Sequence, residues 1–95
     1  MAATSGQVTV TTAGTAVQGP DIDVVNQVTL GGLSGNTGLT YAGNDGAGDV
    51  TNANGFEFDA GGLIRIEVSN KVVTNLSQLW FDCATNGDKV CWILS

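Results

Sequence analysis

Chemistry in this chain would have to come from cysteines and carboxylates, because the sequence contains no histidine. Without histidine there is no imidazole base for a Ser-His or Cys-His nucleophile pair, and the commonest transition-metal ligand is missing. Two carboxylate pairs, Asp21 with Asp23 and Glu57 with Asp59, share a face only where the chain is extended. Nothing around them suggests a catalytic environment. We interpret them as solvated surface groups and expect a protein that is not an enzyme.

The two cysteines, Cys83 and Cys91, flank the dipeptide Asn86-Gly87 between two β-prone runs, which predicts a C-terminal β-hairpin over 79–95. A three-residue turn would place the cysteines opposite one another, whereas a two-residue turn would put them on opposite faces. A disulfide between Cys83 and Cys91 therefore depends on the register of the hairpin. In a reducing cytoplasm both would be small buried side chains, and we favour free thiols over the bond.

A polar loop over 43–54 offers oxygen ligands that would suit a hard cation such as calcium. Asp45 and Asp49 are its acidic residues, but the segment lacks EF-hand spacing and a closing glutamate. We interpret it as a loop and expect neither a metal nor another cofactor. The glycine-rich segment over 31–38 is interpreted as a turn-rich connector, since a phosphate cradle would be followed by Lys-Ser/Thr and a helix pattern.

The elements that must position these residues are strands. β-branched residues dominate the apolar runs, and turn signals recur about every 8–12 residues, which is typical of an all-β sandwich or barrel. We expect a single antiparallel β-sandwich or jelly-roll-like barrel over 1–95, closed by the C-terminal hairpin, with 1–6 as a flexible N-terminal arm. The expected strands are 7–12, 16–17, 24–30, 38–42, 55–58, 63–68, 79–84 and 89–94.

Alternation within these runs assigns some residues to faces. Arg65 and Glu67 alternate with apolar neighbours, so they should face solvent or a partner. The closing hairpin is apolar on both faces, with Trp80 and Trp92 together on one of them. Because such a strand is either central or covered by another subunit, the two tryptophans are packing residues or the apolar centre of a subunit interface.

The charge balance excludes several classes of partner. Nine acidic and three basic side chains give a net charge of −6, which disfavours nucleic acid and anionic membranes. Charged residues make up only 13% of the chain, which lowers the desolvation cost of docking against another protein. No apolar run approaches the roughly 20 residues of a transmembrane helix, and the start lacks the pattern of a secretory signal. We therefore expect synthesis in a cytoplasm.

Three segments in order, 28–43, 54–67 and 75–88, resemble small β-rich virion proteins of tailed bacteriophages. They carry an Asn36-Thr37-Gly38 turn after a strand, an Asn54-Gly55-Phe56 segment, and Asn75-Leu76 ahead of the closing Asn-Gly turn. The chain departs from that pattern at Gly61-Gly62, where the family often has Pro-Gly-Glu, and in having two cysteines.

The resemblance implies a capsid decoration or cement protein on the surface of the virion, made in the host cytoplasm. Its homo-oligomer, most often a trimer, would bridge subunits of the major capsid protein and stabilise the assembled head. The alternatives are another virion component (a head-completion, tail or fibre-associated module) and a β-sandwich that binds carbohydrate or a host surface protein. Candidate contact residues lie in the N-terminus, the polar loop and the tryptophan face: Met1, Ala2, Ala3, Thr4, Asp45, Asp49, Trp80 and Trp92.

Overall fold

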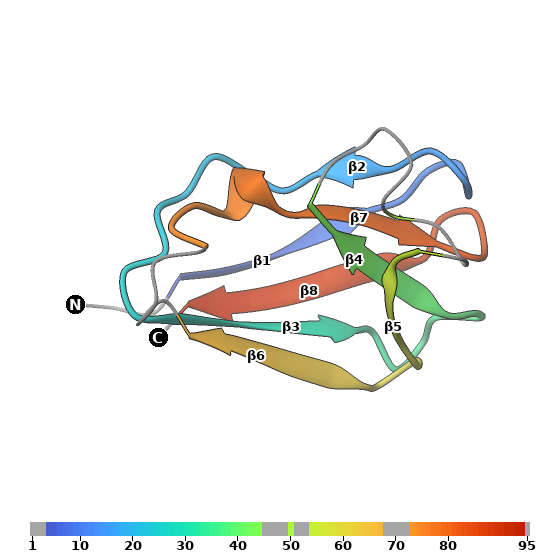
Figure 1. Cartoon of the computed structure of the whole chain (residues 1–95). Coiled ribbons are helices and arrows are strands. Elements are labelled where there is room, and N and C mark those ends of the chain that lie inside the picture. The colour runs from blue at the N-terminus through green and yellow to red at the C-terminus, as the bar shows by residue number, and fades with distance from the viewer. Residues whose placement is uncertain (1–3, 45–49, 51–53, 68–72, 95) are drawn as a thin grey trace.

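The computed structural model of the chain describes residues 4–44, 50, 54–67 and 73–94, and these residues form a β-sandwich. Two four-stranded antiparallel sheets pack face to face, which confirms the fold predicted from the strand pattern (Figure 1). Each expected strand is present, with ends shifted by a few residues. A short 3-10 helix, η1 (Leu76–Gln78), precedes β7.

The strand order defines two sheets, which we call sheet A and sheet B. Sheet A has the order β1-β8-β3-β6 and sheet B the order β2-β7-β4-β5. The strands of sheet A are β1 (Thr4–Thr9), β8 (Lys89–Leu94), β3 (Gln27–Gly32) and β6 (Leu63–Glu67). The strands of sheet B are β2 (Val17–Gln18), β7 (Trp80–Cys83), β4 (Thr40–Gly43) and β5 (Phe56–Phe58).

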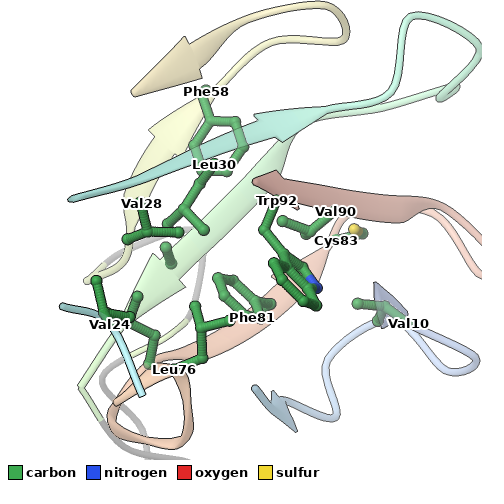
Figure 2. Packing of buried hydrophobic residues seen from close by; sticks show 12 residues of the cluster. Val10, Val24, Val28, Leu30, Phe58, Leu76, Phe81, Cys83, Val90 and Trp92 are labelled. Atoms are coloured by element: carbon green, nitrogen blue, oxygen red, sulfur yellow. The ribbon is translucent and has the colours of Figure 1, made fainter. Parts of the chain in front are cut away.

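The core lies between the two sheets, because alternate residues of each strand point inward. Phe81 from sheet B and Leu30 from sheet A are fully buried there, and Trp92 is 7% exposed. Figure 2 shows these side chains pointing into the same interior. On β6 the inward residues are Ile64 and Ile66, which are half-buried against this core, and the expected outward position of Arg65 and Glu67 is confirmed by their exposure.

The predicted C-terminal hairpin is wrong. The turn after β7 includes Gly87, whose φ of 84° suits glycine, but β7 belongs to sheet B and β8 to sheet A. The chain therefore crosses from one sheet to the other at this turn. The apolar runs on both sides of the turn follow from this crossing, since each strand buries its inner face from the opposite side of one shared core.

The expected flexible arm over 1–6 is also wrong where the structure describes it. Thr4, Ser5 and Gly6 belong to β1 and pair with the last three residues of β8. Gly6 lies directly opposite Trp92, and a Cβ at this glycine would come within 2.7 Å of Cζ2 of the indole. The absence of a side chain at Gly6 is thus what allows the large ring to lie over β1. Residues 1–3 are outside the described residues.

Candidate functional site

The outer face of sheet A is the candidate functional surface. Alternation places Thr29 and Gly31 of β3, Cys91 and Ile93 of β8, and Leu63 of β6 on this face, away from the core. Leu63 is 70% exposed and Ile93 is 44% exposed, which is high for large aliphatic side chains in a sheet. Side chains of this kind mark a surface that is suited to contact with another molecule.

A groove of about 350 Å³ runs between these exposed side chains. Its floor includes Gly31, where an added Cβ would lie 3.3 Å from both Sγ of Cys91 and the carbonyl oxygen of Gly62. The glycine therefore keeps the floor low and leaves the thiol uncovered. The groove is predominantly apolar, and its lining includes Thr29, Gly31, Gly32, Leu33, Leu63, Cys91 and Ile93.

Two glycines in the turn between β5 and β6 form one end of the groove. Gly61 has a φ of 80°, and its N–H donates to the carbonyl of Gly32 at 2.9 Å. Gly62 accepts from the N–H of Gly32 at 3.0 Å and donates to the carbonyl of Asp59 at 2.8 Å. The turn thereby folds back against the end of β3. The Gly61-Gly62 pair, which departs from the family pattern in sequence, is what allows this close approach.

On the side of β3 that faces β8, two hydrogen bonds join the side chain of Asn36 to the main chain of Lys89. Nδ2 of Asn36 donates to the carbonyl of Lys89 at 2.8 Å, and the N–H of Lys89 donates to Oδ1 of Asn36 at 3.0 Å. Asp88 is buried and accepts from the N–H groups of Thr37 and Gly38 at 3.0–3.1 Å. The segment 31–38 is thus not only a connector: it begins in β3 and ends in a turn that is tied to β8.

Both cysteines are free, and they lie in different surroundings. The thiol of Cys91 is half-buried in the groove and donates to the carbonyl of Gly31 at 3.3 Å. The thiol of Cys83 is buried in the core, 3.9 Å from Oγ1 of Thr40, and burial raises its pKa. Because the two strands belong to different sheets, the hairpin register that would decide a disulfide does not exist.

The two tryptophans do not share a face, which corrects the expected Trp80/Trp92 patch. Trp92 points into the core, and its Nε1 is buried without a hydrogen-bond partner among the described residues. Trp80 is half-buried on the outer face of sheet B, where its register neighbours are Gln18 and Gly43. Trp92 is therefore a packing residue of the core.

The outer face of sheet B is more closed than that of sheet A. Tyr41 and Asp82 are paired there and are only 5% and 4% exposed. Oδ1 of Asp82 accepts from the N–H groups of Gly14 at 3.0 Å and Cys83 at 2.8 Å. Burial raises the pKa of Tyr41, and the carboxylates of Glu57 and Asp82 raise it further. The turn that contains Gly14 therefore closes part of this face.

The carboxylates of Asp21 and Asp23 are held by a hydrogen-bonded side chain, and those of Glu57 and Asp59 are on exposed residues. Nδ2 of Asn75 donates to Oδ1 of Asp21 and Oδ1 of Asp23, both at 3.0 Å, while the same residue caps η1. Glu57 is exposed on β5, and the main-chain carbonyl of Asp59 belongs to the turn described above. The part of the chain that the structure describes contains no group of three or more acidic or cysteine side chains that could hold a metal ion. Asp45, Asp49, Met1, Ala2 and Ala3 lie outside the described residues.

Charge is distributed unevenly around the sandwich. Glu67 is the one acidic residue in the strands of sheet A, and two of the three basic residues of the protein, Arg65 and Lys89, belong to the same sheet. The exposed acids described elsewhere in the chain are Asp21, Asp23, Glu57 and Asp59. Few ions would need to lose water when another surface covers sheet A.

The shape and the apolar lining of the groove are suited to binding another molecule. Its lining combines the aliphatic side chains of Leu33, Leu63 and Ile93 with glycine main chain, Trp92, two hydroxyl residues and the thiol of Cys91. Reasoning from sequence missed this groove. The signal that could have revealed it is the glycine pair inside β3, because a glycine within a strand often marks a close approach by another group.

Comparisons with protein-family models, with curated proteins and with solved structures gave no match to this chain. No helix in the described part of the chain is long and apolar enough to cross a membrane. The exposed, weakly charged outer face of sheet A and its groove are therefore the features on which a functional assignment must be based.

Proposed function

We propose that this protein is a non-enzymatic capsid decoration protein of a tailed bacteriophage, which binds the assembled head and bridges subunits of the major capsid protein. The observation that carries the proposal is the outer face of sheet A, where exposed Leu63 and Ile93 flank an apolar groove with few charges around it. The order of turn motifs from Val28 onward supports a phage virion protein in particular. The resemblance favours a trimeric homo-oligomer.

The mechanism is mass-action linkage. A protein that binds only the assembled shell stabilises the shell by RT ln(1 + [L]/Kd), which is about 2.7 kcal/mol when the free concentration is about 100 times the Kd. Contact through apolar side chains suits this role because it requires little dehydration of ions. The acidic groups on other parts of the domain would keep the protein soluble until it meets a complementary surface.

The test is co-sedimentation of the purified protein with expanded heads that lack it, together with the melting temperature of those heads. We expect saturable binding and a higher melting temperature of the shell. Leu63→Glu and Ile93→Glu should each weaken binding at least about tenfold, because they would bury a charge without a partner. Val25→Glu is the matched control, since Val25 is 82% exposed but lies in the connection between β2 and β3.

Each outcome separates the proposal from its alternatives. Equal loss of binding in all three variants would show that charge alone, and not the outer face of sheet A, determines binding. No binding of the wild type to heads would overturn the decoration role. Binding to isolated tails or fibres, or to immobilised glycans, would assign the protein to one of the other two classes instead.

A further inference from the structure

Among the described residues, strand β6 is an open edge of sheet A. It is the last strand in the order β1-β8-β3-β6, and it forms the lower border of the molecule in Figure 1. The N–H of Gly32 bonds to the carbonyl of Gly62 in the same register as the β3–β6 pairing. Because hydrogen-bonded pairs alternate along an antiparallel ladder, Ile64 and Ile66 bond to β3. The N–H and C=O groups of Leu63, Arg65 and Glu67 therefore point away from the sheet.

This edge has charged side chains but lacks the other usual protections against pairing. Natural sheets block their edges with proline, bulges, short strands or charged side chains. The edge strands of sheet B, β2 and β5, are two and three residues long, whereas β6 has five residues and contains no proline. Its exposed charges, Arg65 and Glu67, are of opposite sign and two positions apart. Across β3 they lie opposite the uncharged Thr29 and Gln27.

We propose that β6 pairs antiparallel with β6 of a second copy of this chain, about a two-fold axis at Ile66. In this register Arg65 lies opposite Glu67 of the partner subunit, and Glu67 lies opposite the partner's Arg65. Both pairs use the main-chain groups that point away from β3, so each pair exchanges its two hydrogen bonds. The result is a continuous sheet of the two copies of sheet A.

The same register also covers an apolar side chain. Ile66 faces the inner side of the sheet, where it is only half-buried in the single chain. The two-fold axis places it opposite Ile66 of the partner subunit as a non-hydrogen-bonded pair, the arrangement in which facing side chains approach most closely. One register thus satisfies main-chain groups, opposite charges and an apolar contact together.

Other pairings lack these features. A two-fold axis at Arg65 would place two guanidinium groups opposite each other, which is destabilising. The remaining long edge, β1, has no charged residue, so nothing in it selects a register. The β6 pairing builds on the proposed decoration role by replacing the expected trimer with a dimer, which would occupy two-fold positions of a capsid lattice and not three-fold ones.

Charge reversal tests the register. The mass in solution, measured by light scattering across a concentration series, should be twice that of the chain for the wild type. Arg65→Glu and Glu67→Arg should each raise the dimer Kd at least about tenfold, because both symmetry-related pairs become like-charged. The double variant R65E/E67R should restore the wild-type Kd. Lys89→Glu, which changes the net charge by the same amount as Arg65→Glu away from the β6 edge, should leave the Kd unchanged.

A trimer, a wild type that is monomeric, or a dimer that Arg65→Glu leaves intact would overturn the β6 pairing. Failure of R65E/E67R to restore the dimer, while its thermal unfolding is that of the wild type, would do the same. Binding to heads is measured separately. A monomer that binds heads would overturn the β6 pairing and support the decoration role. A dimer that does not bind heads would support the β6 pairing and overturn the decoration role.

Discussion

Replacing Gly6 by alanine should destabilise the fold through its contact with Trp92. The added Cβ would lie 2.7 Å from Cζ2, 3.0 Å from Cε2 and 3.3 Å from Nε1 of the indole. Overpacking of this kind costs about 1–3 kcal/mol, and the lower entropy of the unfolded chain with alanine returns about 0.4–1 kcal/mol. We expect a net loss of about 1–2 kcal/mol in the free energy of unfolding. For a domain of this size that corresponds to a fall in Tm of roughly 5–15 °C.

The assay is a double-mutant cycle with Trp92→Phe, measured by urea unfolding. Phenylalanine is shorter, and it removes both the indole atoms nearest Gly6 and the buried Nε1 that has no described partner. Trp92→Phe alone should cost about 1–3 kcal/mol because it leaves space in the core. In G6A/W92F the new methyl group fills part of that space, so the combined loss should be smaller than the sum by about 1 kcal/mol or more.

Gly35→Ala is the matched control for this cycle. A Cβ at Gly35 would meet nothing within 4 Å, and its φ is not in the left-handed region. The change should therefore be neutral or stabilising by up to about 1 kcal/mol. Strict additivity of Gly6→Ala and Trp92→Phe would refute the proposed contact. A Gly6→Ala variant as stable as the wild type would show that β1 does not begin before Gln7.

Three further predictions follow from burial and pairing. A thiol reagent at about pH 8 should modify Cys91 in the folded protein at least about tenfold faster than Cys83, a residue that is 1% exposed and whose thiol has a raised pKa; equal rates, read by mass spectrometry, would contradict this. Because the pKa values of Cys83 and Tyr41 are raised from 9.0 and 10.0 in the folded state, the unfolded chain releases these protons first. The free energy of unfolding should therefore fall as pH rises above about 9, and Tyr41→Phe should flatten the part of the fall above about pH 10; melting curves from about pH 8 to 11 that are parallel for both proteins would refute it. Deleting 1–6 should lower the free energy of unfolding by more than about 1 kcal/mol because it removes half of β1. A melting temperature equal to that of the wild type would instead support the prediction that 1–6 is a flexible arm.

The strands could be predicted because the pattern of each is local. Ile64 and Ile66 alternate with Arg65 and Glu67, and this period of two is enough to assign the charged pair to the outer side of the sheet. The glycines that punctuate the chain mark turns correctly at Gly61 and Gly87, both of which have positive φ. Local steric rules are sufficient for features of this kind.

The partner of each strand could not be predicted from the same pattern. An Asn-Gly turn reverses the chain whether the next strand joins the same sheet or the opposite one. Here the choice is decided by distant residues: the N–H of Val10 donates to the carbonyl of Asp88 at 2.9 Å, and the N–H of Gly87 donates to the carbonyl of Val10 at 2.8 Å. These bonds continue the pairing of β8 with β1, which lies at the other end of the sequence, and separate β8 from β7.

Burial of the inward-facing side chains of sheet A decreases from β3 to β6. Val28 and Leu30 on the central strand β3 are fully buried, whereas their neighbours Ile66 and Ile64 on β6 are only half-buried on the same inner side. A sandwich normally closes such an edge with a further strand or a crossing segment, and no described segment does so here. Isoleucine at the inward positions 64 and 66 is therefore more typical of a strand that has a neighbouring strand on each side. The proposed pairing with a second copy of the strand would satisfy this mismatch, because the identical strand would supply Glu67 opposite Arg65 and isoleucine opposite Ile66 at the same time.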